Sequence, residues 1–173
     1  MNDLEDQDLV RRFKHGEDDC FNRIYDKYKV PIYSICYRYT RNGADASELT
    51  QDVFIKIYRN LHRFNERAKL FTWIYRITVN ACISFKRRER NVHQAPPVVS
   101  HGVPLGERIA LKKAIDDALQ RLPPRQRLTF ILRHNLGYSF GEIGSIMGIT
   151  AGAAKANHHQ AVKKMRKSLK DWL

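Results

Sequence analysis

The 173-residue sequence contains few cysteines and no long hydrophobic run. Cys20, Cys36 and Cys82 are odd in number, widely spaced and form no Cys-x-x-Cys pair, which excludes a disulfide scaffold. No stretch approaches the roughly 18–20 apolar residues that a membrane span needs. The first eight residues are acidic and lack the basic region of a signal peptide. We therefore expect a cytoplasmic protein.

Motifs that identify enzymes are also lacking. The seven histidines and three cysteines show no His-Glu-x-x-His or Cys-x-x-Cys spacing, and there is no glycine-rich phosphate loop or nucleophile motif. His158 and His159 are adjacent, so on a helix their side chains diverge by about 100° and do not easily share a metal. We therefore expect no enzyme, no metal site and no cofactor.

Acidic residues are outnumbered, and strand patterns are weak. The chain has 31 Lys and Arg against 18 Asp and Glu, which gives a net charge of +13. Such a charge favours a polyanionic partner, with nucleic acid as the first candidate, although a highly charged soluble surface would give the same composition. No sustained period-two alternation is bounded by turn residues, whereas helical spacing recurs throughout. The fold class we predict is all-α.

Three of the six prolines and two glycines fall in one stretch, residues 91–106, which has few large apolar residues. Such a segment cannot hold a helix and has little to bury. We interpret residues 91–107 as a flexible linker between two small domains, residues 1–90 and residues 108–173. The net charge is +5 over residues 1–94 and +8 over residues 95–173, so the second half is the more basic.

Apolar spacing in the first half predicts four helices. A short one lies around Leu4–Phe13, and a second runs through residues 21–39, with Pro31 as a kink or break. Asp45 stands three residues before Glu48, which is the spacing of a capping box at the start of the third helix. A polar loop at residues 65–69 leads into a long helix over about residues 70–90.

The second half contains a helix-turn-helix pattern. Two helices separated by Pro123 and Pro124 come first, and Pro124 fits the first turn of the second one. Ser139 and Glu142 then form a capping-box pattern before a short helix. A turn at residues 148–150 follows, and Thr150 is positioned to cap the last helix, which runs almost to the C-terminus. In such motifs the second helix enters the major groove of DNA.

Two surfaces have the composition of nucleic-acid contacts. The last helix carries a basic stripe that would face phosphates or, alternatively, only solvent; its members are Lys155, His159, Lys163, Arg166 and Lys170. His158 falls on the apolar face and is expected to pack. In residues 71–80 (FTWIYRITVN), aromatic and polar side chains alternate before the basic run 86–90, as suits single-stranded nucleic acid. Core packing is the alternative for these aromatic residues, and for Trp73 both interpretations stay open.

The order of these motifs resembles one family. Residues 45–54 (DASELTQDVF), residues 71–80, residues 122–127 (LPPRQR) and the terminal helix-turn-helix are together similar to extracytoplasmic-function (ECF) sigma factors of bacterial RNA polymerase. The resemblance covers nearly the whole chain. It implies two helical domains joined by a flexible linker, the second a winged-helix-like, four-helix DNA-binding domain. It also implies promoter-specific transcription initiation, for a stress or envelope-response regulon.

The resemblance implies roles for particular residues. The third helix would dock on the β′ clamp helices of core RNA polymerase, whose β flap is a further partner, through Glu48, Gln51, Asp52 and Phe54. The promoter −10 element would be melted and read by Asn65, Lys69, Thr72, Trp73, Arg76, Asn80, Lys86, Arg87 and Arg88. The −35 element would be read by Ser139, Lys155, Asn157, His159, Gln160 and Lys163. A further partner implied by the family is an anti-sigma factor, which is often membrane-tethered.

The recognition helix departs from the family pattern. Many relatives have GTVKSRLHRA where residues 152–161 are GAAKANHHQA, so that Ala156, Asn157 and Gln160 replace a serine and two arginines. Arginine pairs with guanine, whereas Asn and Gln pair better with adenine. We therefore expect an altered −35 preference. The alternative function is a stand-alone helix-turn-helix regulator with a helical sensing domain, which would need neither the 45–54 face nor the 71–80 aromatics.

Overall fold

The computed structural model describes residues 3–92 and 107–172, with backbone only for residues 86–92, 107–109 and 171. This part of the chain holds eight α-helices, one 3-10 helix and no strand, which confirms the all-α prediction. The α-helices are α1 (Asp3–Lys14), α2 (Asp19–Thr40), α3 (Gly43–Leu61), α4 (Leu70–Val92), α5 (Glu107–Gln120), α6 (Pro124–Asn135), α7 (Phe140–Met147) and α8 (Ala151–Ser168), and the 3-10 helix η1 spans Lys170–Trp172. Residues 93–106, most of the predicted linker, lie outside the described residues, whereas residues 91 and 92 belong to α4 and residue 107 begins α5.

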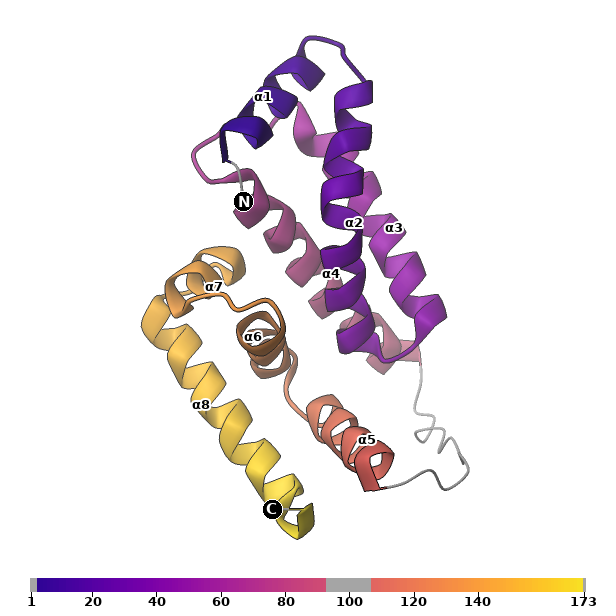
Figure 1. The fold of residues 1–173 in the computed structure, drawn as a ribbon, viewed down its shortest axis with the longest axis vertical. Coiled ribbons are helices and arrows are strands. Elements are labelled where there is room, and N and C mark those ends of the chain that lie inside the picture. Colours follow the sequence, from indigo (N-terminus) through magenta and orange to yellow (C-terminus); the bar gives the residue numbers. More distant parts are fainter. Residues whose placement is uncertain (1–2, 93–106, 173) are drawn as a thin grey trace.

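The first four helices form a bundle in which α2 packs along both α3 and α4 (Figure 1). Buried residues recur with helical spacing along α2, among them Ile24, Tyr28, Ile32 and Ile35. Pro31 lies inside α2, which continues without interruption, so the prediction of a break there is wrong. Proline removes one backbone hydrogen bond, but the buried side chains on both sides of Pro31 hold the helix against the core.

The cap at the start of α3 differs from the predicted one. The helix begins at Gly43, and the side chain of Asn42 accepts hydrogen bonds from the backbone N–H groups of Ala44 at 2.8 Å and Asp45 at 3.3 Å. Asp45 therefore lies within the first turn, where its negative charge interacts favourably with the helix dipole. The Asp45–Glu48 capping box is thus wrong, and the side chain of Glu48 is not needed for capping.

The helix-turn-helix motif has the predicted form. Ser139 and Glu142 form a reciprocal capping box at α7, and the Thr150 hydroxyl accepts a hydrogen bond from Ala153 N–H at 3.1 Å at the start of α8. The two helices approach so closely that a Cβ atom at Gly144 would lie 2.8 Å from the Ile149 carbonyl oxygen. A side chain at position 144 would therefore force the turn apart.

The two halves of the chain share one hydrophobic core. Helices α6 and α7 pack against α2 and α4, so buried side chains from both halves form one cluster (Figure 1). The ring of Tyr138 stacks on Phe71 with a centroid separation of 5.9 Å and lies 5.7 Å from the ring of Tyr75. The described arrangement is therefore a closed one.

Buried polar contacts reinforce this closure. Arg127 of α6 is 2% exposed, and its Nη1 donates hydrogen bonds to the Tyr39 carbonyl oxygen at 3.0 Å and to Gln120 Oε1 at 2.8 Å. Gln120 Nε2 donates to the same carbonyl at 3.0 Å, and Arg41 forms an ion pair with Asp116. The C-terminal end of α2 is thereby held by three side chains from the second half.

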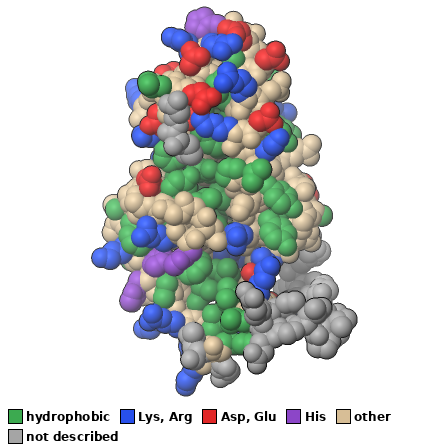
Figure 2. Space-filling view, viewed as in Figure 1, with side chains coloured by type: hydrophobic (Ala, Val, Ile, Leu, Met, Phe, Trp, Pro, Cys, Tyr) green, Lys and Arg blue, Asp and Glu red, His purple; other side chains and the backbone are tan. Residues whose placement is uncertain are grey.

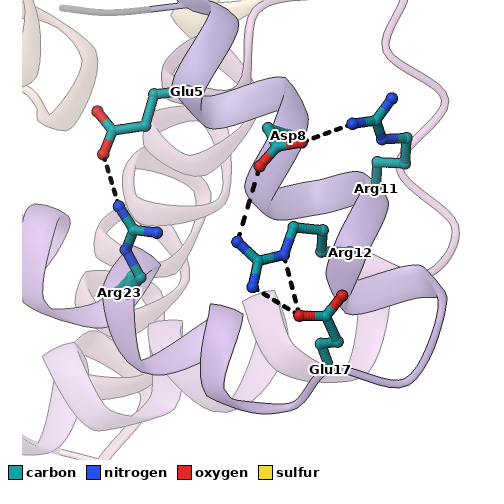
Figure 3. A network of polar contacts seen from close by, with 6 residues as sticks. All are labelled: Glu5, Asp8, Arg11, Arg12, Glu17 and Arg23. Atoms are coloured by element: carbon teal, nitrogen blue, oxygen red, sulfur yellow. Dashed lines mark hydrogen bonds and ion pairs between the residues drawn. The ribbon is translucent and has the colours of Figure 1, made fainter.

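Charged side chains gather at the opposite end of the molecule. Figure 2 shows Lys, Arg, Asp and Glu crowded around α1, above a hydrophobic area that crosses the middle of this face. Arg12 bridges Asp8 and Glu17, and Glu5 pairs with Arg23 (Figure 3). These side chains are largely exposed, and exposed pairs add little to stability. This network keeps the surface polar, whereas the Arg127 contacts hold the halves together.

Candidate nucleic-acid interface

A groove with aromatic walls lies between α2 and α3. Its volume is about 1000 Å³. Three of the predicted polymerase-contact residues, Glu48, Gln51 and Phe54, line it, while Asp52 is half-buried outside the lining. The ring of Phe54 lies 4.5 Å from that of Tyr25. The groove therefore combines a carboxylate and an amide with an apolar floor.

Several aromatic residues of this groove were not predicted as site residues. Phe21, Tyr25 and Tyr33 come from α2, and Tyr58 comes from α3. Tyr25 and Tyr58 are more than 40% exposed. The signal was present in the sequence, because Tyr25, Lys29 and Tyr33 repeat every four residues beside the buried stripe of α2 and thus mark a second face.

A smaller pocket of about 380 Å³ lies between α3 and α4. Trp73 and Asn80, two of the residues predicted for the −10 site, line it. Lys56 and Asn60 of α3 and Arg63 of the turn after it complete the pocket and were missed, although Lys56 and Asn60 are four residues apart and therefore share one helix face. The pocket thus offers an indole ring, two amides and two cations, a composition that suits one unstacked base beside its phosphates.

Two other predicted −10 residues face α7. Thr72 is 7% exposed, and Arg76 Nη2 donates a hydrogen bond to the Ser145 carbonyl oxygen at 2.6 Å. Both line a hollow of about 540 Å³ between α4 and α7, together with Arg67, Glu142 and others. The structure therefore divides these residues between two faces of α4, one lining the open pocket beside α3 and one facing α7, where Thr72 is buried and Arg76 is exposed but bonded to Ser145.

The rest of the predicted −10 set lies in or beyond the loop between α3 and α4. Asn65 Oδ1 accepts a hydrogen bond from Arg67 N–H at 3.3 Å, and Lys69 Nζ lies 2.5 Å from Asp3 Oδ2 of α1. This hydrogen-bonded contact raises the pKa of Lys69. The side chains of Lys86, Arg87 and Arg88 lie outside the described residues.

The predicted −35 residues fall mainly on the exposed side of α8. Lys155, His159, Gln160 and Lys163 are exposed and Asn157 is half-buried. Ser139 is engaged in the capping box, and its backbone N–H and hydroxyl lower the pKa of Glu142. The basic stripe is thus available to a ligand in the closed arrangement.

His158 packs against the domain, as predicted. Its Nε2 lies 2.9 Å from Nε2 of His134 on α6, and the two rings stack with centroids 5.1 Å apart. Burial lowers the pKa of both imidazoles, and Arg133 lowers both further. One imidazole donates and the other accepts, so the contact requires at least one neutral ring.

The described residues offer neither a metal site nor a membrane-spanning helix. In that part of the chain, no three His, Cys, Asp or Glu side chains gather as a metal site would require. Over the same residues, no helix has the length and apolar character needed to cross a membrane.

Comparison with protein families matches both halves of the chain. The family description Sigma-70 region 2 matches residues 24–92, which include α3, α4 and the loop between them. The description Sigma-70, region 4 matches residues 112–165, which include the helix-turn-helix motif. The two matches occur in the same order as the two surfaces described above.

Curated relatives match over nearly their full lengths. The ECF RNA polymerase sigma factor SigW of Bacillus subtilis is 29% identical, over 94% of this chain and 95% of the relative. RNA polymerase sigma factor CarQ of Myxococcus xanthus is also 29% identical, over 92% and 95%. The ECF RNA polymerase sigma-E factor of Escherichia coli is 26% identical, over 91% of each chain.

Solved structures share the fold. CnrH, solved in complex with the cytosolic domain of CnrY, matches with a TM-score of 0.75 and 18% identity, over 96% of this chain and 98% of that one. The sigma factor RpoE of Bartonella quintana, solved with the anti-sigma factor NepR, matches with a TM-score of 0.69 and 22% identity, over 88% and 98%.

Proposed function

Because the chain belongs to the sigma-70 family, in its extracytoplasmic-function branch, we propose that it binds core RNA polymerase and directs initiation at specific promoters. The observation that carries this proposal is the ordered match of region 2 and region 4 to the two halves that hold the pockets and the recognition helix. The protein acts by binding and not as an enzyme, and it acts in the cytoplasm, where promoters and polymerase meet. The stand-alone regulator is not favoured, because the region 2 match occupies the half that would have to be a sensor.

The groove between α2 and α3 is the proposed docking surface for the polymerase clamp helices. Tyr25, Phe54 and Tyr58 provide an apolar surface, and Glu48 and Gln51 provide polar groups beside it. A helix that inserts apolar side chains and presents basic ones fits this combination. Because Glu48 does not serve as a cap, its carboxylate is available to such a partner.

The pocket between α3 and α4 is the proposed site of −10 strand capture. Extrusion of a base from a duplex costs a few kcal/mol. Stacking on an aromatic ring returns about 1–3 kcal/mol per base, and Trp73 is placed for this role. Lys56 and Arg63 would hold the adjoining phosphates. Since the pocket accepts only an unstacked base, binding there favours melted over paired DNA.

Full engagement of the −10 strand requires the closed arrangement to open. Thr72 is buried beside α7, and Arg76, although exposed, is hydrogen-bonded to Ser145 of α7, so both become fully free to bind DNA only after α7 leaves α4. Polymerase and promoter would supply the differential binding energy that shifts the equilibrium to the open form. This proposal rests on two domains, one ending with α4 and one beginning with α5, and on the segment between them letting them part.

An anti-sigma factor is the proposed inhibitor. The sigma factor RpoE of Bartonella quintana, which shares the fold, was solved in complex with the anti-sigma factor NepR. The aromatic groove is the surface best suited to receive one, because it is open and apolar even when the two halves are closed.

Run-off transcription with core polymerase tests the function. We expect a promoter-dependent transcript only when the protein is added, and a loss of this transcript when Gln51→Lys and Tyr58→Ala are combined in the groove. Arg125→Met, on the exposed side of α6, is the control and should leave transcription unchanged. If the wild-type protein bound duplex DNA but never core polymerase, the stand-alone regulator would replace this proposal.

A further inference from the structure

The loop between α3 and α4, residues 62–69, adopts a conformation that needs support from outside. Glu66 has a φ angle of +60°, in the left-handed region that non-glycine residues enter only at a cost. Phe64, two residues earlier, is buried, and its ring lies 5.1 Å from that of Trp73. The loop is therefore connected directly to the pocket between α3 and α4.

Lys14, near the end of α1, supplies this support. Its Nζ donates a hydrogen bond to the Phe64 carbonyl oxygen at 2.6 Å and lies 3.3 Å from Glu66 Oε1. One ammonium group thus holds both neighbours of Asn65, and the Lys14 side chain is only 28% exposed. A hydrogen bond from a charged donor in such a partly buried place is among the stronger kinds.

The start of α1 holds the far end of the same loop. Asp3 Oδ2 lies 2.5 Å from Lys69 Nζ, so the acidic start of α1 meets a basic loop residue and its basic end meets an acidic one. Figure 1 shows α1 lying beside the loop that runs from α3 to α4. The charges at the two ends of α1 are therefore opposite in sign to those of the loop residues that they contact.

We propose that Lys14 is a positioning residue for −10 recognition. It holds Phe64 and Glu66 so that Asn65 is presented to the strand and the Trp73 ring keeps its place, and it does so without contacting DNA. This inference rests on the proposed function, because it assigns a role in the same strand-capture site. Lys14 belongs to α1, which lies before residue 24, where the region 2 match begins.

The test uses reconstituted holoenzyme and a promoter probe with a preformed −10 bubble. Lys14→Met removes the ammonium group but keeps the side-chain length, and we expect about tenfold weaker capture of the probe. Base preference at the −10 positions should change as well, because the loop loses its fixed conformation. Lys14→Arg should restore most of the affinity. Arg11→Met is the control. It removes an exposed cation of α1 that pairs with Asp8 of the same helix, and the variant should behave as wild type.

Salt dependence separates positioning from direct contact. A residue that binds a phosphate lowers the slope of log affinity against log salt by about one when it is removed. We expect Lys14→Met to leave this slope unchanged. A lower slope, unaltered base preference or wild-type affinity would each overturn the inference.

Two further comparisons keep the result interpretable. If Lys14→Met does not fold, Lys14→Gln replaces it. This variant keeps a donor for the Phe64 carbonyl oxygen but loses the charge that faces Glu66, and its affinity, base preference and salt slope are judged in the same way. If wild-type holoenzyme does not initiate at all, the proposed function fails. If it initiates and Lys14→Met is indistinguishable from it, only the positioning role of Lys14 fails.

Discussion

The two faces of α4 are built from the same ten-residue segment and yet meet different surroundings. Toward α3, Trp73 and Asn80 line an open pocket with cations at its edge. Toward α7, Thr72 is buried and Arg76 is hydrogen-bonded to Ser145. Thr72 and Trp73 are adjacent, so their side chains diverge by about 100° around the helix, and one element serves a permanently accessible site and a conditionally accessible one. The difference shows that the position of α7, in the second half of the chain, decides how accessible this face of α4 is to DNA.

The largest expected effect comes from Arg127→Met, which removes the buried donor that joins α6 to the end of α2. We expect the contact between the halves to weaken by about 2–3 kcal/mol, because a charged hydrogen-bond donor is lost from a buried site. Small-angle X-ray scattering of the free protein should report a larger radius of gyration. Arg125→Met is the matched control on the exposed side of α6, and an unchanged radius for Arg127→Met would contradict the closure described here.

A second effect should appear on the open face alone. Trp73→Ala is expected to weaken capture of a single-stranded −10 probe by about 1–3 kcal/mol, since one stacking surface is lost. The radius of gyration should stay that of the wild type, because the pocket between α3 and α4 does not contact α7. Equal binding of bubble and duplex probes by wild-type holoenzyme would remove the basis of this prediction.

Arg76→Ala and Asn80→Ala sharpen the comparison further. Both should weaken binding of the bubble probe by holoenzyme, but only Arg76→Ala should also loosen closure, by about 1 kcal/mol, through loss of its bond to Ser145. Proteolytic cleavage between the halves measures this loosening. We expect faster cleavage for Arg76→Ala than for Asn80→Ala. Equal cleavage rates would show that the two faces of α4 do not differ in their contact with the second half.

The smallest effect concerns pH and the second half alone. Burial lowers the pKa of His134 and His158, so folding favours their neutral forms. The stabilisation is complete above the ordinary histidine pKa of about 6.5 and is lost as pH falls below it. Solvent reaches and screens both rings, so we expect a change below about 1 kcal/mol even though the positive charge of Arg133 acts in the same direction as burial.

Thermal melting between pH 7.5 and 5 measures this dependence. His158→Phe keeps an aromatic ring against His134 but removes one titrating group, and it should flatten the profile. His159→Gln, at an exposed neighbouring position, should not. A profile for His158→Phe as steep as that of the wild type would show that the histidine pair is not responsible.

Much of the site could be predicted because its signals are local. The helix-turn-helix caps at Ser139 and Thr150 depend on side chains that contact backbone within three residues, and the structure confirms both. The cap of α3 was misassigned because Asn42 and Asp45 offer competing local patterns, and spacing alone does not rank them. Lys56, Asn60 and Arg63 were overlooked because a polar helix face is typical of solvent exposure, and only the nearby Trp73 makes it a pocket.

The sequence by itself determined the all-helical class, the helix-turn-helix motif, the basic charge and the residue types suited to single-stranded and duplex DNA. These follow from periodicity, capping and composition, which act over a few residues. Only the tertiary structure decided that Arg127 reaches Tyr39, that Arg76 reaches Ser145 of α7, and that Lys14 holds the loop of Asn65. Each of these contacts joins residues about fifty or more positions apart, and local patterns carry no information about which distant partner satisfies a buried donor or carbonyl.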